Sequence, residues 1–414
     1  MNYFRYRKGE LFCEEVSLRA LCGRHGTPLY VYSKRTIVQH YRHLRRSWRP
    51  YPVVVAYAMK ANSNLALLRI FRDLGAWVDT VSLGEMVRAL RAGFPPQRII
   101  FGGVGKSEEE LAYAVRKRVF MVVADSIEEL HLLAAAARRA GRRVRVAIRV
   151  NPGVDPMTHE YIATGMKESK FGVQGDEAPA CFELAASLAG LDVVGIHQHI
   201  GSQIVEIKPF LESLRWLARL VSRIGRQGIR LRWIDIGGGI GITYKDEHPF
   251  ALEDFTRQVL PVIRETGCRL IVEPGRVLVG NAGALLTRVL YVKTGRSRNF
   301  VIVDAAMNDL IRPAFYNAYH EILPVRRRGG SLVADVVGPV CESGDFLARD
   351  RVLESPGRGD LLAVMSAGAY GFAMSSNYNA RPRAAEILVS GKRGTVVRRR
   401  ETLRDLVRGE PVRP

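Results

Sequence analysis

The sequence lacks an apolar run long enough to cross a membrane. Its longest dense apolar stretch, Val53 to Met59, is far shorter than the roughly 20 residues that a bilayer span needs. The N-terminus also lacks the charged and then apolar pattern of a secretory signal peptide. We therefore expect a soluble, cytoplasmic protein without a membrane partner.

Cysteine is scarce. The five cysteines are an odd number, and no two of them have the close spacing of a metal-binding or redox pair. We expect reduced thiols, as in a reducing compartment, and no metal. The five are Cys13, Cys22, Cys181, Cys268 and Cys341.

A basic tail and a recognised nucleic-acid-binding motif are also lacking, although the formal net charge is +21. Of the 62 basic residues, 11 are Lys and 51 are Arg. The arginines are spread along the chain, with only short runs such as Arg326 to Arg328 and Arg398 to Arg400. We interpret the charge as a general arginine bias that allows non-specific polyanion binding, and we expect no specific nucleic-acid partner.

What the sequence does contain is a regular alternation of strand and helix patterns. Its 414 residues, 47% of them hydrophobic, exceed one typical domain. Between about residues 50 and 275, short β-branched runs alternate with segments of helical apolar spacing. The eight predicted strands are Val53–Ala58, Trp77–Ser82, Arg98–Phe101, Val119–Ala124, Val144–Val150, Val193–His199, Leu231–Ile236 and Arg269–Glu273.

Helices are predicted between these strands, and several open with a Ser, Asn or acidic cap. Eight β/α units in roughly 225 residues are typical of a closed (β/α)8 barrel of the TIM type. A doubly wound open sheet would more often carry GxGxxG after its first strand, and none is present. The predicted helices include Asn64–Leu74, Glu85–Ala92, Ser107–Lys117, Ser126–Ala140, Phe210–Arg226 and Phe250–Thr266.

After about residue 280 strand-like runs follow one another without comparable helices, which predicts a separate, mainly antiparallel β domain. The segment that ends in Leu29–Tyr32 could add a strand to it. We therefore expect an α/β fold, with a barrel over residues 33–278 and a β domain formed by residues 1–32 and 279–414. The predicted strands are Leu285–Thr294, Phe300–Asp304, Asp335–Val340, Leu361–Ser366, Glu386–Val389 and Thr395–Arg399.

The active site of such a barrel lies at the carboxyl ends of its strands. Lys60 follows the first strand, and Asp79 lies in the second. A lysine just past an apolar strand loses part of its solvation, which favours the neutral amine that forms a Schiff base. Taken alone, Lys60 is more often explained as a surface lysine.

Three glycines, Gly237 to Gly239, follow the seventh strand. Such a turn lets backbone N–H groups approach an anion, as glycine-rich turns do for phosphates. For a lone Gly-Gly-Gly, a plain tight turn is the more frequent explanation. Ser202, after the sixth strand, and Arg276, beside Gly275 after the eighth, could reach a phosphate from neighbouring strand ends, which favours the anion site.

Glu273 is a carboxylate at the end of the apolar run Leu270–Val272, where a bare charge would be costly unless paired. One partner would be the ring nitrogen of pyridoxal phosphate, which an acidic residue keeps protonated. Arg276 is another, and the two are compatible. His199 could stack on the same ring or could be an ordinary core histidine. Together the strand-end residues indicate pyridoxal phosphate as the cofactor.

Several longer segments are more specific than these single residues. The chain resembles the pyridoxal-phosphate-dependent decarboxylases with an alanine-racemase-type barrel, and within them the diaminopimelate decarboxylase family. The resemblance runs along nearly the whole chain, from the segment 26–32 to the segment 378–383. Its most specific parts are His199–Gln203, Glu273–Arg276, Met307–Pro313, Gly338–Asp345 and Gly368–Gly371.

The resemblance implies that Lys60 binds the cofactor covalently, that His199 packs on its ring and that Glu273 pairs with the ring nitrogen. It also implies that Cys341 donates the proton that replaces the lost carboxylate. A thiol suits this role because it is protonated near neutral pH and yet gives up its proton readily, although a free cysteine is more commonly a small buried apolar residue. The expected cofactor-binding residues are Lys60, Asp79, His199, Ser202, Gly237, Gly238, Gly239, Glu273, Gly275, Arg276 and Tyr370.

The implied reaction is the decarboxylation of meso-diaminopimelate to L-lysine and CO2, the last step of lysine biosynthesis. Arg276 and Arg312 with Tyr316 would bind the distal carboxylate, because an Arg fork can bind a carboxylate bidentately. Glu342 would bind the distal ammonium, and Tyr370 also contributes to the substrate site. Ornithine and arginine have no distal carboxylate, and this difference favours meso-diaminopimelate.

The resemblance further implies a homodimer, in which Cys341, Glu342 and Tyr370 complete the site of the partner subunit. Three alternatives stay open at this stage. They are another decarboxylase of the same fold, an amino acid racemase, and a non-catalytic pyridoxal-phosphate carrier. Replacement of Cys341 would separate a carrier from a decarboxylase.

Overall fold

The structure is a computed structural model, and it describes residues 2–154 and 170–411. It contains two compact units, which we call the barrel unit and the β unit. The barrel unit comprises Tyr41–Ile242 and Glu247–Val277. The β unit comprises Met1–His40, Thr243–Asp246 and Leu278–Pro414.

The barrel unit is built on eight parallel strands that close on themselves. Strand β13 pairs with β5, and β8 pairs with β9, so the sheet has no open edge. Closure confirms the predicted barrel and excludes an open doubly wound sheet. The strands are β5 (Val53–Ala58), β6 (Trp77–Thr80), β7 (Ile99–Phe101), β8 (Met121–Ala124), β9 (Val144–Asn151), β11 (Leu191–His197), β12 (Trp233–Asp235) and β13 (Arg269–Val272), with a short β10 (Val173–Gln174) beside β9.

These strands form because their side chains are buried on both faces, so each strand is a nearly continuous apolar run rather than an alternating one. All four residues of β8 are buried, and Met121 and Val123 belong to the barrel core with Trp233 and Ile271. Burying one such side chain stabilises the fold by about 1.5–3 kcal/mol.

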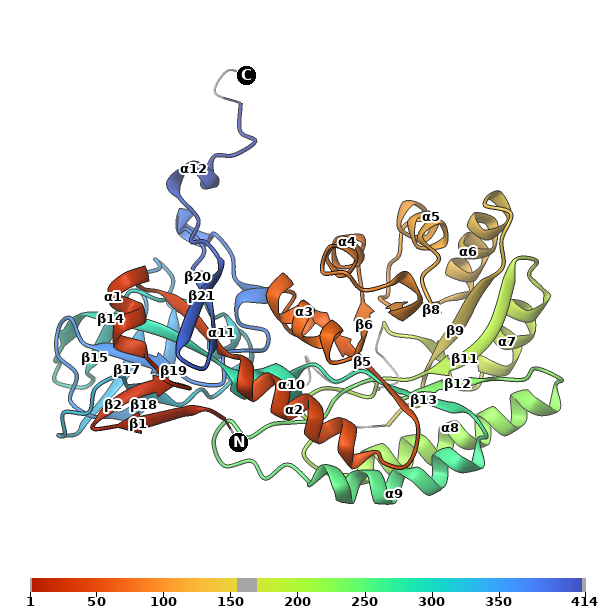
Figure 1. Cartoon of the computed structure of the whole chain (residues 1–414), viewed down its shortest axis with the longest axis horizontal. Coiled ribbons are helices and arrows are strands. Elements are labelled where there is room, and N and C mark those ends of the chain that lie inside the picture. The colour runs from red at the N-terminus through yellow and green to blue at the C-terminus, as the bar shows by residue number, and fades with distance from the viewer. Residues whose placement is uncertain (1, 155–169, 412–414) are drawn as a thin grey trace. The chain divides into compact units, whose positions relative to one another are not determined.

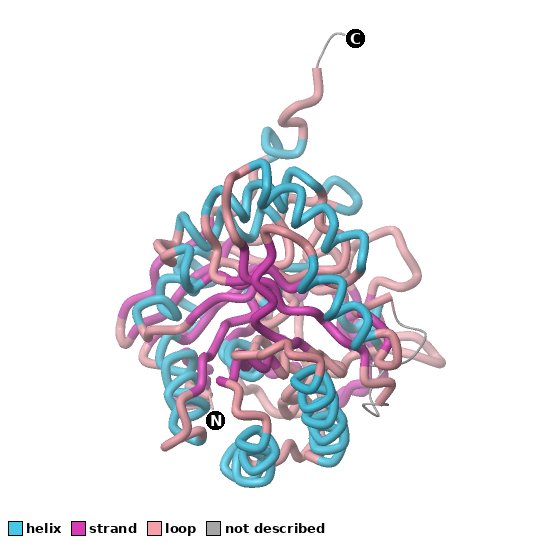
Figure 2. Tube along the Cα trace, turned by 90° about the vertical axis from the view of Figure 1, so that its right-hand side faces the viewer, coloured by secondary structure: helices cyan, strands magenta, loops and turns pink. Residues whose placement is uncertain are grey.

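Helices surround the barrel strands (Figure 2). In four of them the N-cap side chain accepts a hydrogen bond from a backbone N–H of the first turn. Each such cap stabilises its helix by about 1 kcal/mol. The caps are Asn64, Ser82, Ser107 and Ser126. The helices are α3 (Leu65–Asp73), α4 (Leu83–Arg91), α5 (Glu108–Lys117), α6 (Ile127–Arg139), α7 (Ala178–Ser187), α8 (Lys208–Arg226) and α9 (Leu252–Glu265), and α2 (Lys34–Ser47) precedes β5.

The β unit contains a nine-stranded sheet that is mainly antiparallel, with parallel pairs β15–β17 and β4–β20. Strand β4, from the N-terminal segment, lies in this sheet between β14 and β20, which are both labelled in Figure 1. The strands are β4 (Leu29–Ser33), β14 (Gly283–Lys293), β15 (Phe300–Val303), β16 (Ile322–Pro324), β17 (Leu332–Val337), β18 (Phe346–Leu353), β19 (Leu361–Val364), β20 (Ala385–Ser390) and β21 (Arg393–Arg398).

Smaller elements complete this unit. A three-stranded antiparallel sheet near the N-terminus precedes helix α1, and short helices flank the main sheet. These elements are β1 (Phe4–Arg7), β2 (Glu10–Cys13), β3 (Val16–Ser17), α1 (Leu18–His25), α10 (Arg276–Val279), which runs across the boundary of the units, α11 (Arg312–Tyr316) and α12 (Leu403–Leu406).

Some elements differ from the prediction. The strand expected at Asp335–Val340 begins earlier, at Leu332, and ends at Val337, so Gly338–Val340 lie outside it. Strand β18 was not predicted, because Arg349, Asp350 and Arg351 interrupt its apolar pattern. The short β16 was also not predicted, and no bounds were predicted for helix α7, which lies between the fifth and sixth strands of the prediction.

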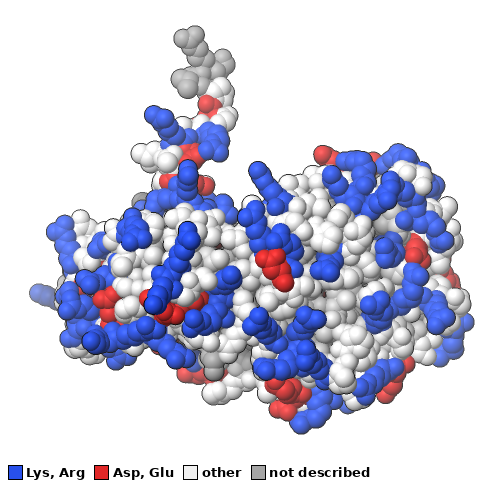
Figure 3. Space-filling model, viewed as in Figure 1, with Lys and Arg blue, Asp and Glu red and all other residues white. Residues whose placement is uncertain are grey.

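Basic side chains are scattered over the visible face of the molecule rather than gathered in one stripe, as Figure 3 shows. This distribution agrees with a general arginine bias. Among residues 2–154 and 170–411, no helix is both long and apolar enough to span a bilayer.

Candidate active site

The first predicted site residue, Lys60, lies in a short 3-10 helix (Met59–Ala61) that directly follows β5. Its Nζ atom is 4.0 Å from Oδ2 of Asp79, which is buried at the end of β6. Burial raises the pKa of Asp79 well above its usual value, the negative charge of Glu273 raises it further, and Lys60 lowers it. Strands β5 and β6 are neighbours in the barrel, and they place an amine beside a carboxyl at one strand end.

The three glycines after β12 make close backbone contacts that other residues could not make. Gly237 has φ +66° and Gly239 has φ +103°, which side chains rarely tolerate. A Cβ atom on Gly238 would lie 2.3 Å from the carbonyl oxygen of Glu273. The chain therefore passes very close to the end of β13, and only glycine permits this passage.

Two predicted phosphate ligands, Arg276 and Ser202, form a hydrogen bond with each other. Nη2 of Arg276 donates to Oγ of Ser202 over 2.9 Å. Arg276 is buried, and a Cβ atom on Gly275 would lie 3.2 Å from the carbonyl oxygen of Ala58. The end of β13 and the segment after β11 thus bring a guanidinium and a hydroxyl together, as an anion site requires.

His199 lies two residues beyond the end of β11, not within the strand as predicted. The backbone N–H of Gly238 donates to its Nδ1 over 3.3 Å. Desolvation lowers the pKa of His199 well below its usual value, and the charges of Lys60 and Arg149 lower it further. The ring is therefore neutral near pH 7 and carries its proton on Nε2.

Glu273 forms a buried hydrogen bond that the sequence did not reveal. Its Oε2 lies 3.3 Å from Nε2 of His197, and both side chains are about 6% exposed. Burial alone would raise the pKa of Glu273, but His197 and Lys60 outweigh it and hold the pKa at about 2. Glu273 is therefore ionised across the physiological range and can keep a bound base protonated.

Asp235 completes this buried group from the end of β12. Its Oδ1 accepts from the N–H of Gly237 over 2.9 Å. Burial raises the pKa of Asp235 well above its usual value, and the charge of Glu273 raises it further. Of the two neighbouring carboxyl groups, Glu273 holds the negative charge and Asp235 is the one that retains a proton more readily.

His197, Asp235 and Glu273 offer ligand atoms within 4.8 Å of one another, an arrangement that could also hold a metal ion. The hydrogen bond between His197 and Glu273 already uses one ligand atom of each. We interpret the three residues as a hydrogen-bonded group that sets the charge of Glu273, and we test the metal alternative below.

Prediction from the sequence assigned no role to His197, Asp235 or Arg149. Arg149 is buried in β9, desolvation lowers its pKa, and the charges of Asp125 and Glu273 raise it. One sequence feature could have identified all three residues. Each is an ionisable residue inside an otherwise apolar barrel strand, where a charge requires a partner.

The other predicted residues belong to the β unit. Arg312 is buried at the start of α11, where its Nη1 lies 2.9 Å from Nε2 of His320 and its guanidinium lies over the ring of Tyr244. Tyr316 ends the same helix, and its ring is 4.8 Å from that of Phe315. Arg312 and Tyr316 are thus presented by one short helix.

Cys341 and Glu342 follow β17 in an exposed segment. Cys341 is the one exposed thiol of the five, and its N–H donates to Oδ1 of Asn379 over 2.8 Å. Oε1 of Glu342 accepts from the N–H of Gly344 over 3.3 Å. Tyr370 has a left-handed backbone, with φ +56°. Exposure leaves the thiol and the carboxylate able to meet another molecule.

The residues of the barrel unit have the parts that a phosphate-bearing aromatic cofactor requires. Lys60 supplies an amine, and Glu273 supplies an ionised carboxylate for a ring nitrogen. The glycine turn offers backbone N–H groups, and Arg276 with Ser202 offers a guanidinium and a hydroxyl, which are the groups that bind a phosphate. The donor set therefore fits pyridoxal phosphate.

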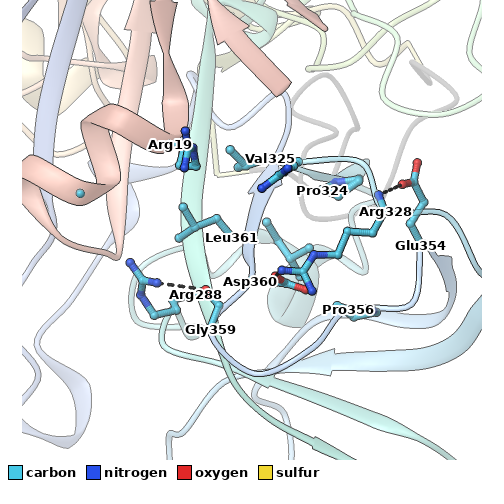
Figure 4. Close-up of a pocket in the computed structure, with 13 residues that line it drawn as sticks. Arg19, Arg288, Pro324, Val325, Arg328, Glu354, Pro356, Gly359, Asp360 and Leu361 are labelled. Atoms are coloured by element: carbon cyan, nitrogen blue, oxygen red, sulfur yellow. Dashed lines mark hydrogen bonds and ion pairs between the residues drawn. The ribbon is translucent and has the colours of Figure 1, made fainter. Parts of the chain in front are cut away.

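The β unit also contains a cavity of about 280 Å³, and none of the predicted site residues lines it (Figure 4). Arg328 pairs with Asp360 over 2.7 Å, and Arg288 donates to the carbonyl oxygen of Gly359 over 3.0 Å. Because Asp360 already provides an anion for Arg328, we interpret the charged residues around the cavity as structural. Its charged lining residues are Arg19, Arg288, Arg326, Arg328, Glu354 and Asp360.

Known proteins match the chain over most of its length. Residues 34–280 match the family described as pyridoxal-dependent decarboxylase, pyridoxal binding domain. The chain is 49% identical over 402 residues to the diaminopimelate decarboxylase of Aquifex aeolicus, covering 96% of this chain and 95% of that protein. It is 48% identical over 415 residues to that of Pseudomonas aeruginosa, covering 100% of both.

A solved structure extends the similarity to the fold. The diaminopimelate decarboxylase from Helicobacter pylori, complexed with L-lysine, has a TM-score of 0.91 to this chain. The two are 40% identical, and the match covers 94% of this chain and 98% of that one.

Proposed function

The chain belongs to the pyridoxal-dependent decarboxylase family, among the diaminopimelate decarboxylases, and we propose that it converts meso-diaminopimelate to L-lysine and CO2 with pyridoxal phosphate. The substrate has an amino acid head at each end. The reaction would remove the carboxylate of the D-configured head and leave the L-configured head intact.

One observation carries the cofactor proposal. Four barrel strands, β5, β11, β12 and β13, end in residues suited to different parts of one cofactor. Lys60 would hold it covalently, Glu273 would face the ring nitrogen, and His199 would lie on the ring. Ser202, Arg276 and the backbone of Gly237–Gly239 would hold the phosphate.

When bound, pyridoxal phosphate supplies an electron sink for the negative charge that decarboxylation leaves on the α-carbon. The side chains of this chain prepare it for that role. Glu273 is ionised because His197 and Lys60 favour its charged form, so it can keep a proton on the ring nitrogen. Neutral His199 can cover the ring without adding a competing positive charge.

The residues of the β unit would bind and protonate the substrate. Arg312 and Tyr316, with Arg276, would bind the distal carboxylate, and Glu342 would bind the distal ammonium. Cys341 would give its proton to the carbon that has lost CO2, and its exposed thiol is free of the burial that makes the other four cysteines poor proton donors. Tyr370 would contact both cofactor and substrate.

We also propose that two chains associate as a cytoplasmic homodimer and share their active sites. Cys341 and Glu342 are exposed in the isolated chain, which supports a role for them in another subunit's site. Size-exclusion chromatography with light scattering should give a dimer. A monomer that retains full activity would contradict this proposal.

A decarboxylase for ornithine or arginine is the nearest alternative. Those substrates end in a cation, and a buried arginine would repel it. Arg312 is 5% exposed, and its charge would have no distal carboxylate to bind. The position of Arg312 therefore favours meso-diaminopimelate over these substrates.

Covalent attachment at Lys60 tests the cofactor proposal. The purified protein should absorb visible light after incubation with pyridoxal phosphate, and borohydride reduction should fix the cofactor on the peptide that contains Lys60. Lys60→Ala should abolish fixation and lower kcat by at least about 10³-fold. The matched control is Lys208→Ala, whose ammonium is exposed in α8. Fixation on another lysine would contradict the proposal.

A further inference from the structure

We propose that His320 is a positioning residue that holds the guanidinium of Arg312 for the distal carboxylate of the substrate, and so sets the selectivity for a substrate with two amino acid heads. This inference rests on the proposed function, because it assigns a support to the arginine that would grip that carboxylate.

The contact itself is short and buried. Nη1 of Arg312 lies 2.9 Å from Nε2 of His320, and Nδ1 of His320 lies 2.8 Å from the carbonyl oxygen of Met365. His320 is 0% exposed and Arg312 is 5% exposed. A buried hydrogen bond to a charged group is among the stronger contacts in proteins, and losing one partner leaves a costly unsatisfied group.

These two contacts fix the state of the imidazole. A guanidinium can only donate hydrogen bonds, so Nε2 of His320 must accept. The carbonyl of Met365 can only accept, so Nδ1 must donate. His320 is therefore neutral and carries its proton on Nδ1. A protonated ring would place an N–H against the N–H of Arg312.

The backbone holds His320 at both sides. Its carbonyl oxygen accepts from Nη1 of Arg351 over 3.0 Å, and the N–H of Met365 donates to the carbonyl oxygen of the next residue, Glu321, over 2.8 Å. The second bond extends the pairing of β16 with β19. The ring of His320 is thus anchored to the main sheet of the β unit.

Tyr244 restrains the guanidinium from another direction. The Cζ atom of Arg312 lies 4.6 Å from the centre of the Tyr244 ring, which is packed edge-on against the ring of His320 at 5.3 Å. A guanidinium held by a stacked ring and an imidazole acceptor has few orientations left. The fork of Arg312 is therefore pre-organised, which reduces the conformational entropy lost when a carboxylate binds.

The proposal predicts that His320 matters for ligands that carry a distal carboxylate and not for those that lack it. L-lysine, the product, retains this carboxylate, whereas cadaverine is the same diamine without it. Dissociation constants for both can be measured from the visible absorbance of the cofactor-loaded protein. This binding measurement does not depend on catalytic turnover.

The test uses two replacements. His320→Phe keeps a flat ring but removes the acceptor, and we expect the Kd of L-lysine to rise about 10- to 100-fold while that of cadaverine changes less than about threefold. His320→Gln restores an acceptor and should recover part of the affinity for L-lysine. The control is His131→Gln, an exposed histidine on α6.

Arg312→Lys should weaken L-lysine binding by itself, and adding His320→Phe to it should weaken binding little further, because the two residues act through one contact. An equal rise in both dissociation constants for His320→Phe, or full additivity with Arg312→Lys, would overturn the proposal. Failure of the proposed function is seen separately, as a wild-type protein that makes no lysine from meso-diaminopimelate.

Discussion

Oε2 of Glu273 and Nε2 of His197 lie 3.3 Å apart in the closed interior of the barrel unit, and neither side chain is reached by much solvent. A buried carboxylate without a partner would take up a proton. His197 prevents this and, with Lys60, holds the pKa of Glu273 at about 2. The electron sink of the proposed reaction depends on this charge.

Glu273→Gln keeps the size of the side chain but removes its charge. We expect kcat to fall about 10²-fold or more, because the amide cannot keep the ring nitrogen protonated. Steady-state kinetics on meso-diaminopimelate measures the change. The control is Glu265→Gln, whose carboxylate is exposed at the end of α9 and should be silent.

The same variant also tests whether His197, Asp235 and Glu273 form a hydrogen-bonded group beside the cofactor or bind a metal ion. We expect the active wild-type protein to contain no stoichiometric metal and to keep its activity after dialysis against a chelator. A metal ion bound at one per chain, lost in Glu273→Gln and required for activity, would contradict our interpretation of this group.

The glycine turn gives a prediction about shape. In Gly238→Ala the added Cβ would lie 2.3 Å from the carbonyl oxygen of Glu273, so the backbone must move. We expect weaker pyridoxal phosphate binding, by about 10-fold or more, and a lower Tm. Gly225→Ala is the matched control, because a Cβ there meets nothing within 4 Å and alanine should stabilise helix α8 by about 0.5–1 kcal/mol. Equal behaviour of the two variants would contradict the close approach.

The cysteines give a prediction about reactivity. Burial raises the pKa of Cys22 to about 12 and that of Cys181 to about 11, whereas Cys341 is exposed. We expect one fast-reacting thiol per chain, located at Cys341 by peptide mapping and protected by L-lysine. Cys341→Ser should lower kcat about 10²- to 10³-fold and leave cofactor binding intact. Unchanged decarboxylase activity would contradict the proton-donor role of Cys341, and Cys181→Ala serves as the control.

Asp309 gives a prediction about pH. Burial raises its pKa from 3.8 to about 7, although the hydrogen bond that the backbone N–H of Ala306 donates to the carboxylate lowers the pKa. The folded state therefore binds this proton more tightly than the unfolded state. Its contribution to stability is complete below about pH 4 and is lost as the pH rises through about 7.

Asp309→Asn should remove this loss. Relative to wild type, the free energy of unfolding of the variant should increase between about pH 5 and pH 8, by no more than about 3 kcal/mol. Urea unfolding at both pH values measures the difference. The exposed Asp73→Asn should show no such trend, and a constant difference for Asp309→Asn would refute the assigned pKa.

The fold could be predicted from the sequence where one pattern dominates. Strand β5 was predicted at its observed bounds, because Val53–Ala58 is an unbroken apolar run. Strand β18 was missed, since Arg349 to Arg351 mask its pattern and only pairing with β17 stabilises it as a strand. Closure of the barrel depends on the pairing of β8 with β9, which no local pattern encodes.

The candidate site was predictable to a different degree in each unit. Lys60 and the glycine turn follow from their positions after apolar strands. The roles of Arg312, Cys341 and Glu342 came from family resemblance, because nothing in their spacing indicates a shared ligand. His197 and His320 were missed, since a hydrogen bond between residues 76 or 8 positions apart becomes visible only in three dimensions.

The most direct measurement is an assay of the purified protein with pyridoxal phosphate and separate samples of meso-diaminopimelate, ornithine, arginine and lysine, in which CO2 is followed and the amine product is identified. We expect CO2 and L-lysine from meso-diaminopimelate alone. CO2 from ornithine or arginine and none from meso-diaminopimelate would contradict the proposed substrate and the roles of Arg312 and Glu342.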